Sequence, residues 1–226
     1  MAKHSKRYET ALSLIDREKR YTIVEAIEII QKLPKAKFEE SLEVSMKLGI
    51  DPKHSEQQIR GSVALPNSLG KTKRVIAFAE GQAADDAKAA GAIEVGGQDL
   101  VEKIQAGWTD FDVAVASPDM MRFVGRLGRV LGPQGKMPSP KSGTVNENVA
   151  RAVKEFSAGR IEYRNDNGGN LHAIVGKISQ PLEKLQENVE AFINHIRASQ
   201  PPGAKGTFIQ KIVLSSSMGP GLILAV

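Results

Sequence analysis

Residues 125–145, GRLGRVLGPQGKMPSPKSGTV, are the part of this sequence that comes nearest to a chemical motif. Glycine-rich loops bind phosphates because their backbone amides can approach the anion closely. A Walker-type loop needs glycine where Val130 stands and Ser or Thr where Met137 stands, so the stretch fails that test. Its prolines instead predict a rigid, extended surface from which Lys136 and Lys141 project, either as a structural linker or as an RNA-contact surface.

The other side chains that could carry out catalysis form no recognisable group. There is no GxSxG nucleophile elbow, and no GxGxxG loop follows the first predicted parallel strand. Asp85 and Asp86 lie early in a predicted helix, where the helix dipole accounts for them. The sequence has no cysteine, and its 4 histidines, His172 among them, lack metal-ligand spacing. We therefore expect no enzymatic activity, no cofactor and no metal site.

Two short segments combine groups suited to a polar partner. The string SSSMGPG, residues 215–221, follows an apolar strand and offers hydroxyls and a glycine that let a partner approach the backbone. An ordinary polar turn is the alternative. Lys35–Phe38 is a basic segment with one aromatic residue, and by spacing alone Phe38 could equally belong to the core.

Charge and composition favour a cytoplasmic, soluble protein with a polyanionic partner. Lys+Arg 31 and Asp+Glu 26 give a net charge of +5, and hydrophobic residues make up 41% of the 226 residues. An aromatic content of 5% argues against binding single strands by stacking. The N-terminus lacks an apolar signal region and no apolar run is long enough to cross a membrane, so we expect no membrane partner.

The basic residues are unevenly distributed along the chain. Residues 70–119 hold 5 basic and 9 acidic side chains, residues 120–158 hold 7 and 2, and the two ends together hold 19 and 15. The middle of the chain is therefore predicted to have one basic side facing a polyanion, with an ordinary solvated surface as the alternative. The cations of this side are Arg122, Arg126, Arg129, Lys136, Lys141, Arg151 and Lys154.

The secondary structure predicted to position these residues differs between the middle of the chain and its two flanks. From residue 71 to 131, three short apolar strands alternate with helices, the last helix running to about Leu131, which is typical of a parallel sheet covered on both faces. The flanks predict helices after Thr22 and over 181–198, and strands over 41–50, 58–65 and 207–215. A hairpin is expected to join 160–164 to 171–178, and a capping box at Thr144 and Glu147 to start another helix.

Neither flank is long enough to bury a core alone. We therefore expect a chain of mixed α/β and α+β class: residues 1–68 and 160–226 form one discontinuous α+β domain, and residues 69–159 form an inserted Rossmann-like, three-layer α/β domain. Gly70 and Gly159 lie at the two chain crossings and are the predicted hinge. Two consecutive domains divided near residue 140 are the alternative.

Several strings occur together in a characteristic order: AKFEESLEVSMKLGIDP, IRGSVALPNSLGK, GRVLGPQGKMPSPKSGTV, GRIEYRNDNGGNLH and the closing SSSMGPG. With them the chain resembles, over nearly its whole length, the bacterial family of large-subunit ribosomal proteins conventionally numbered one (the L-one family). The strongest match covers residues 121–139. The resemblance implies a two-domain fold in which the domain made from both ends binds large-subunit rRNA.

The resemblance also implies partners and site residues. It implies a mobile ribosomal stalk that helps release deacylated tRNA from the exit site, repression of translation of the protein's own mRNA, and a monomer when free. Its implied rRNA-binding residues include Lys37 and Phe38, and Ser217, Met218 and Gly219, where serine replaces the family's usual threonine. We add as rRNA-binding candidates Arg164, Asp166, His172 and Ser215, and as tRNA or secondary RNA contacts Arg122, Arg126, Arg129, Lys136 and Lys141.

Two alternatives remain open at this point. A Rossmann-like metabolic enzyme with a basic surface would need a nucleotide loop and a catalytic group, and the sequence offers neither. A scaffold that binds only proteins would show no tight, salt-sensitive binding to rRNA. Gln134 and Lys136 stand where arginine and a hydrophobic residue are common in the family, which leaves the role of that loop open.

Overall fold

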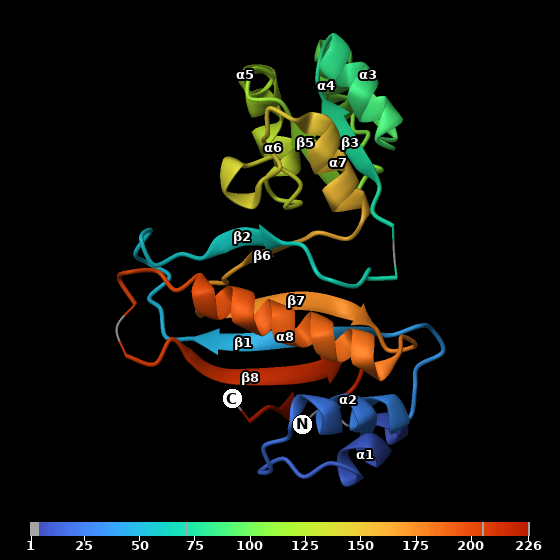
Figure 1. The fold of residues 1–226 in the computed structure, drawn as a ribbon, viewed down its shortest axis with the longest axis vertical. Helices are drawn as coiled ribbons and strands as arrows, with labels where there is room; N and C mark the ends of the chain where they lie inside the picture. Colours follow the sequence, from blue (N-terminus) through green and yellow to red (C-terminus); the bar gives the residue numbers. More distant parts are fainter. Residues whose placement is uncertain (1–4, 71, 205, 226) are drawn as a thin grey trace. The chain divides into compact units, whose positions relative to one another are not determined.

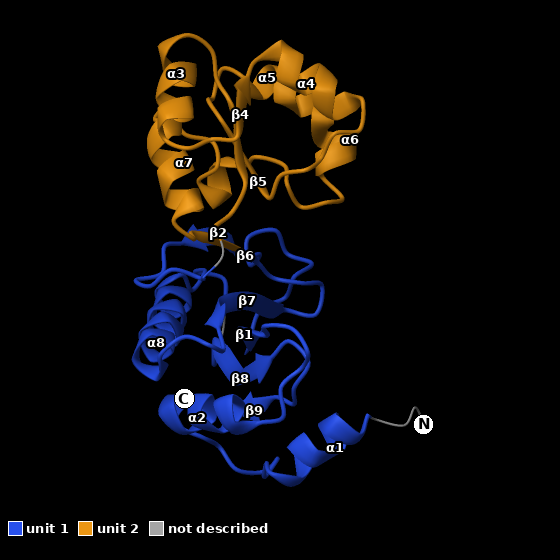
Figure 2. Cartoon of the chain, turned by 90° about the vertical axis from the view of Figure 1, so that its right-hand side faces the viewer, with its two compact units in different colours: residues 1–70, 163–226 blue, residues 71–162 orange. Residues whose placement is uncertain are grey.

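The chain forms two compact units in the computed structural model, which describes residues 5–70, 72–204 and 206–225 (Figure 1). Unit 1 consists of residues 1–70 and 163–226, and unit 2 of residues 71–162 (Figure 2). The predicted boundaries after residues 68 and 159 lie within a few residues of this division. That the two units are separate domains stays a prediction.

Unit 1 is built on a four-stranded sheet with the order β7-β1-β8-β9. The central strand β1 (Ser41–Leu48) pairs antiparallel with β7 (Asn170–Lys177) and with β8 (Ile209–Ser216). β9 (Leu222–Ile223) pairs with β8 at the edge and was not expected from the sequence. A second, two-stranded sheet joins β2 (Arg60–Val63) to β6 (Ile161–Arg164).

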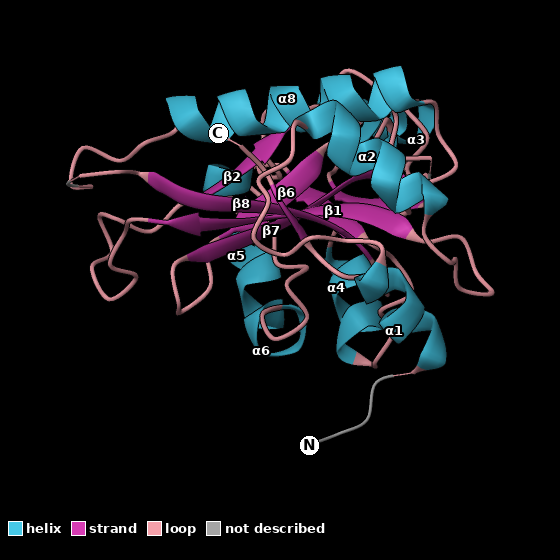
Figure 3. Cartoon of the chain, turned by 90° about the horizontal axis from the view of Figure 1, so that it is seen from below, coloured by secondary structure: helices cyan, strands magenta, loops and turns pink. Residues whose placement is uncertain are grey.

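Alternation along the strands gives this sheet one buried face. Leu42, Val44 and Met46 of β1 are buried, whereas Ser45 and Lys47 between and beside them are not. The helices α2 (Ile23–Lys32) and α8 (Leu182–Ala198) cover the buried face, as Figure 3 shows. The helix α1 (Lys6–Ser13), which the sequence patterns did not predict, lies on the other side of the sheet (Figures 2 and 3).

The two main helices of unit 1 begin as their sequences predict. Thr22 and Glu25 form a capping box: the Thr22 side chain accepts a hydrogen bond from the Glu25 amide, and the Glu25 carboxylate accepts one from the Thr22 amide. α8 begins directly after Pro181 and buries Leu185, Phe192 and other apolar residues of one face. The structure confirms both predicted helices.

Unit 2 has three layers. Its parallel sheet has the order β4-β3-β5, from β3 (Val75–Phe78), β4 (Glu94–Gly96) and β5 (Val113–Ala116). One face packs against α3 (Gln82–Ala89) and α7 (Val149–Ser157). The other packs against α4 (Gln98–Gln105), α5 (Met121–Val124), the short 3-10 helix η1 (Gly125–Leu127) and α6 (Gly128–Leu131). Together the two units confirm a mixed class of sheets and helices.

Three local predictions were wrong. The hairpin across residues 165–169 is reduced to one bridge, Asn165 to Leu171, because β6 pairs with β2 and β7 pairs with β1. The helix expected to run continuously to Leu131 is broken into α5, η1 and α6, where Gly125 and Gly128 weaken the helical conformation.

The third wrong prediction is the capping box at Thr144 and Glu147. α7 instead has Asn148 as its N-cap, whose side chain accepts a hydrogen bond from the Arg151 amide at 2.9 Å. Thr144 is buried and its hydroxyl accepts a bond from the Ser139 amide at 2.8 Å. Its carbonyl accepts one from the Ala116 amide at 2.9 Å, so Thr144 belongs to an extended segment beside β5. The short helix η2 (Pro140–Ser142) precedes it.

Candidate nucleic-acid interface

The face of the unit 1 sheet opposite α2 and α8, here called the open face, carries polar and cationic side chains. Lys47, His172 and Lys211 are exposed on it, as is Ile174, which has 45% of its surface accessible. The strand register places Ser45 of β1 directly opposite His172 of β7. An exposed sheet surface with cations and hydroxyls is suited to a polyanionic partner.

The closing turn, residues 217–219, follows β8 at one end of this sheet. Ser217 and Met218 are exposed, Met218 by 54%. The Ser217 hydroxyl accepts a hydrogen bond from the Ser41 amide at 3.1 Å, and the Ser217 amide donates to the Ser41 carbonyl at 3.1 Å. As a donor, the Ser217 hydroxyl has only a long contact of 3.5 Å to the same carbonyl, so it retains the capacity to donate to a partner.

The basic segment, residues 35–38, precedes β1, the strand whose Ser41 bonds the closing turn. Phe38 is 56% exposed and Lys37 is exposed, so the alternative that Phe38 belongs to the core is wrong. A single exposed ring is not unusual by itself, so its position relative to the closing turn matters more than its exposure. The segment and the closing turn each therefore present one large apolar side chain to solvent.

A buried carboxylate joins these two segments. Glu40, only 5% exposed, accepts hydrogen bonds from the Ala36 amide at 2.7 Å, the Ser216 hydroxyl at 2.6 Å and the Met218 amide at 3.2 Å. Burial raises the pKa of Glu40, but these hydrogen bonds and the charge of Arg7 outweigh it and hold the pKa below its ordinary value. The carboxylate is therefore ionised at neutral pH.

Arg7 of α1 completes the connection. Its guanidinium donates to the Pro34 carbonyl at 3.0 Å and to the Met218 carbonyl at 2.9 Å, and lies 3.6 Å from the Glu40 carboxylate. Arg7 thus contacts the closing turn and Pro34, the residue directly before the basic segment. Sequence reasoning missed Arg7 and Glu40, although the position of Glu40, two residues before the buried Leu42, places its charge at a core position of the strand pattern.

Gly219 has an intramolecular reason to lack a side chain. A Cβ at this position would lie 2.4 Å from the Ser216 hydroxyl oxygen, which is the group that donates to Glu40. Any other residue would therefore displace Ser216 from the carboxylate. Ser215, which precedes Ser216 in β8, is half-buried. It pairs with Glu43 of β1, and both residues belong to the open face.

Three candidates lie in β6, in β7 and on the loop between these strands, and they differ in their surroundings. Asp166 folds the loop, because its carboxylate accepts bonds from the amides of Gly168 at 2.8 Å and Asn170 at 2.7 Å. Its hydrogen bonds with Asn170 are the main cause that lowers its pKa. His172 bonds the Ser45 hydroxyl through Nδ1 at 3.0 Å, and Arg164 is exposed. Asp166 thus holds the loop, while Arg164 and His172 are exposed to a partner.

The predicted basic side of unit 2 is not one surface. Arg122, Arg126 and Arg129 are exposed on the helices that cover one face of the parallel sheet, whereas Arg151 and Lys154 lie on α7, against the other face. The prediction that seven cations share one side is therefore wrong. Their proximity in the sequence did not indicate that helices on opposite faces of the sheet carry them.

Lys136 was also expected to project, and it does not. Its ammonium donates to the Thr109 carbonyl at 2.9 Å and lies 5.1 Å from the centre of the Phe111 ring, so it is held in place within unit 2. Lys141 is exposed as expected.

The two predicted hinge glycines both have left-handed backbones, with φ of 73° at Gly70 and 110° at Gly159, conformations that side chains disfavour.

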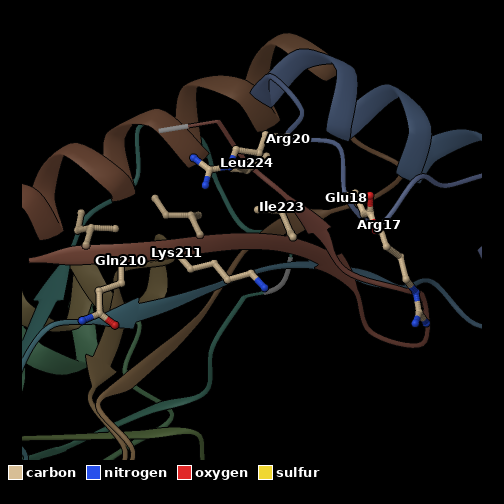
Figure 4. Close-up of a pocket in the computed structure, with 9 residues that line it drawn as sticks. Arg17, Glu18, Arg20, Gln210, Lys211, Ile223 and Leu224 are labelled. Carbon is tan, nitrogen blue, oxygen red and sulfur yellow. The ribbon is translucent and has the colours of Figure 1, made fainter. Parts of the chain in front are cut away.

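A cavity of about 470 Å³ lies at the edge of the unit 1 sheet, between the segment after α1 and the start of β8 (Figure 4). Arg17, Arg20 and Lys211 line it together with the carboxylate of Glu18. Figure 4 shows the side chains of Arg17 and Lys211 pointing in different directions, so the cations do not converge on one anion. The cavity is a weaker candidate than the closing turn.

Comparison with known proteins settles the family. Residues 30–220 match the sequence model of the Ribosomal protein L1p/L10e family. The chain is also 54% identical over 224 residues to the large ribosomal subunit protein uL1 of Kosmotoga olearia, which covers 99% of this chain and 97% of that protein. The chain belongs to this family. It is therefore a structural, non-enzymatic constituent of the large ribosomal subunit, and the resemblance seen in the sequence strings is confirmed.

Two further observations concern the parts of the chain that the structure describes. None of the helices there is both long enough and apolar enough to cross a membrane. Among the same residues, no group of three or more His, Asp or Glu side chains could hold a metal ion. The metabolic-enzyme alternative is answered by membership of the ribosomal L1 family rather than by these absences.

Proposed function

We propose that this ribosomal L1 family member binds large-subunit rRNA through unit 1, using the basic segment, the closing turn and the open face. The main support for this proposal comes from Phe38 and Met218, two large apolar side chains that are more than half exposed. They lie on two segments that the buried Glu40 carboxylate joins. Exposed apolar groups flanked by cations and hydroxyls suit a preformed RNA surface, where riboses and base faces alternate with phosphates.

Each group has a distinct part in this proposal. Lys37, Arg164 and His172 face phosphates, Ser215 and Ser217 bond the RNA backbone or 2′-hydroxyls, and Phe38 and Met218 pack on riboses or base faces. Asp166 contributes by holding its loop, since a carboxylate repels phosphate. Gly219 contributes by leaving room for the Ser216 hydroxyl at Glu40.

We extend the proposal to the roles of the bound protein. Units 1 and 2 act as two domains, with boundaries near 68 and 160 and with Gly70 and Gly159 at the hinge. The rRNA-bound protein forms the mobile stalk of the ribosome in the cytoplasm, and it helps release deacylated tRNA from the exit site. Arg122, Arg126, Arg129 and Lys141 of unit 2 are the candidate tRNA contacts, because all four are exposed.

The same RNA surface serves a regulatory role in this proposal. An mRNA segment of the protein's own message that presents the same structure as the rRNA site would occupy unit 1 and repress translation. The free protein is a monomer. This part of the proposal makes the rRNA fragment and the mRNA segment competitors for one surface.

A filter-binding titration tests the rRNA proposal directly. The full chain is titrated with a fragment carrying the large-subunit rRNA stalk helix, with an unrelated RNA duplex as competitor. We expect the stalk fragment to bind far more tightly than the duplex, and Met218→Ala to weaken that binding. Equal binding of the two RNAs would refute the proposal.

A matched control is available in unit 2. Ile93 is 52% exposed, close to the 54% of Met218, so Ile93→Ala removes a comparable exposed apolar group away from the proposed surface. We expect Ile93→Ala to bind the stalk fragment as the unsubstituted protein does. If both variants lose affinity equally, the loss does not report on the closing turn.

A further inference from the structure

Two charged side chains lie behind the proposed RNA surface without being part of its exposed residues. Glu40 is buried and Arg7 is largely covered, with 28% of its side chain exposed, so neither presents much surface to a large partner. Both nevertheless bond the backbone of the segments that do. Their contacts reach residues 34 and 36 on one side and residues 216 and 218 on the other.

We propose that Arg7 and Glu40 are positioning residues that hold the basic segment and the closing turn in one RNA-binding arrangement. This inference rests on the proposed function of unit 1. It assigns the N-terminal helix α1 a role in RNA binding, through the guanidinium that fastens it to the Met218 carbonyl.

The geometry of Glu40 supports this role. One carboxylate oxygen accepts from the Ala36 amide, and the other accepts from both the Ser216 hydroxyl and the Met218 amide. The two oxygens therefore fix the spacing of two segments that are 176 or more residues apart in sequence. A glutamine could not replace it, because its amide nitrogen is a donor and would face donors on one side.

The geometry of Arg7 adds a second bridge over the same gap. Its two terminal nitrogens donate to the carbonyls of Pro34 and Met218, and its charge balances that of the buried Glu40 carboxylate. A lysine would retain the charge but could not span both carbonyls with a planar pair of donors. The Met218 backbone is consequently held at both its amide and its carbonyl.

Fixing the backbone matters because Met218 and Phe38 are exposed and have no core packing to hold them. A partner that binds a preformed surface avoids the entropy of ordering it on contact. Loosening either segment would therefore lower RNA affinity even where the fold of unit 1 is intact.

The test uses the full chain and the stalk-helix rRNA fragment. We expect Glu40→Gln to weaken binding by about tenfold and Arg7→Gln by about fivefold, in the range for the net contribution of a typical hydrogen bond. Arg17→Gln is the matched control: it changes the net charge equally in the same N-terminal region but makes none of the Arg7 contacts. Equal losses for Arg7→Gln and Arg17→Gln would overturn the inference, because net charge alone would then explain them.

Two readouts separate positioning from general destabilisation. Amide protons bonded to a carboxylate resonate at low field, so Glu40→Gln should move the NMR signals of Ala36 and Met218 while those of α8 stay in place. In a double-mutant cycle, Arg7→Gln should cost less in a Met218→Ala background than alone, because Arg7 acts through Met218. Fully additive losses, or unmoved amide signals, would overturn the inference.

Failure of the inference is distinguishable from failure of the proposed function. If Met218→Ala binds the fragment as tightly as the unsubstituted protein, the closing turn is not the RNA surface and both ideas are wrong. If Met218→Ala weakens binding but the Arg7 and Glu40 variants, shown to be folded by thermal unfolding, do not, only the positioning role is wrong.

Discussion

The two large sheets of this protein differ in how completely they are covered. In unit 2 every residue of β3 and β5 is buried, because helices pack on both faces of the parallel sheet. In unit 1 buried and accessible residues alternate along β1, because α2 and α8 cover one face. The difference shows where a partner can reach backbone and side chains together: the open face of unit 1, and only helix surfaces and loops in unit 2.

The comparison also separates two ways of presenting cations. The exposed arginines of unit 2 stand on short helices, where they add charge but no fixed backbone groups. In unit 1, Lys37 follows Ala36, whose amide Glu40 holds, and the same carboxylate and Arg7 hold the backbone of the closing turn. We therefore expect unit 1 to recognise a defined RNA structure and unit 2 to contact phosphates with little selectivity.

The largest expected effect contrasts one isoleucine in each sheet. Ile76 of β3 is completely buried, so Ile76→Ala should lower the free energy of unfolding of unit 2 by about 2–5 kcal/mol. Ile174 is 45% exposed, so Ile174→Ala should change the stability of unit 1 by no more than about 0.5 kcal/mol. Denaturant titration measures both free energies of unfolding. A large loss of stability for Ile174→Ala would show that this part of the open face is packed rather than exposed.

The second prediction concerns the Ser217 hydroxyl. Ser217→Ala removes a group that accepts from Ser41 and is available to RNA, and should cost about 1–3 kcal/mol in rRNA binding. Ser217→Thr keeps the hydroxyl and adds one methyl, worth up to about 0.8 kcal/mol if buried. Ser217→Val keeps that shape without the hydroxyl. Affinities should follow the order threonine at or above serine, then valine and alanine; four equal affinities would make the turn purely structural.

The third prediction addresses unit 2. Replacing Arg122, Arg126 and Arg129 with Gln should weaken tRNA-dependent closure of the stalk while leaving rRNA binding by unit 1 unchanged. Each arginine that no longer neutralises a phosphate should reduce the slope of log affinity against log salt by roughly 0.7–0.9. Single-molecule measurements on ribosomes report the closed population, and an unchanged population would remove these arginines from the tRNA contact.

The smallest expected effect is a pH dependence in unit 2. Burial raises the pKa of Glu155, but hydrogen bonds and charges from Arg151 and Arg160 lower it below its ordinary value overall. A carboxyl group whose pKa is lowered by folding stabilises the fold at pH values above its unfolded pKa of about 4.3. This contribution is lost as the pH falls through the folded pKa.

Glu155 is partly exposed, so its contribution to stability should be less than about 1 kcal/mol. Glu155→Gln should therefore lower the melting temperature slightly at pH 7 and not at pH 3. A difference that persists at pH 3 would assign the effect to packing rather than to charge.

Local patterns predicted most of the elements, and long-range pairing explains the errors. The capping box at Thr22 and the apolar spacing of α8 specify helices from residues within a few positions of one another. The hairpin at 165–169 has an equally clear local signal, yet β7 pairs with β1, more than a hundred residues away in sequence. Turn composition specifies a bend, but the strands' partners depend on which hydrophobic faces must meet.

The candidate site shows the same limit. Sequence strings pointed to Lys37, Phe38 and residues 217–219, of which all but the half-buried Gly219 are exposed. Arg7 and Glu40 were missed because their partners are mostly backbone atoms of distant segments. A charged residue at a buried position of a strand pattern, as at Glu40, was the only local signal for either of them.

The contacts of Arg7 and Glu40 also have a consequence for protein synthesis. Arg7 and Met218 are 211 residues apart, and Glu40 and Ser216 are 176 apart, so the surface needs both an early and a late part of the chain. A ribosome makes the chain from residue 1 onward, and any product that stops before residue 216 lacks the closing turn and the Ser216 and Met218 groups that bond Glu40. Incomplete products therefore lack the assembled surface and should not compete with finished protein for places on new ribosomal subunits.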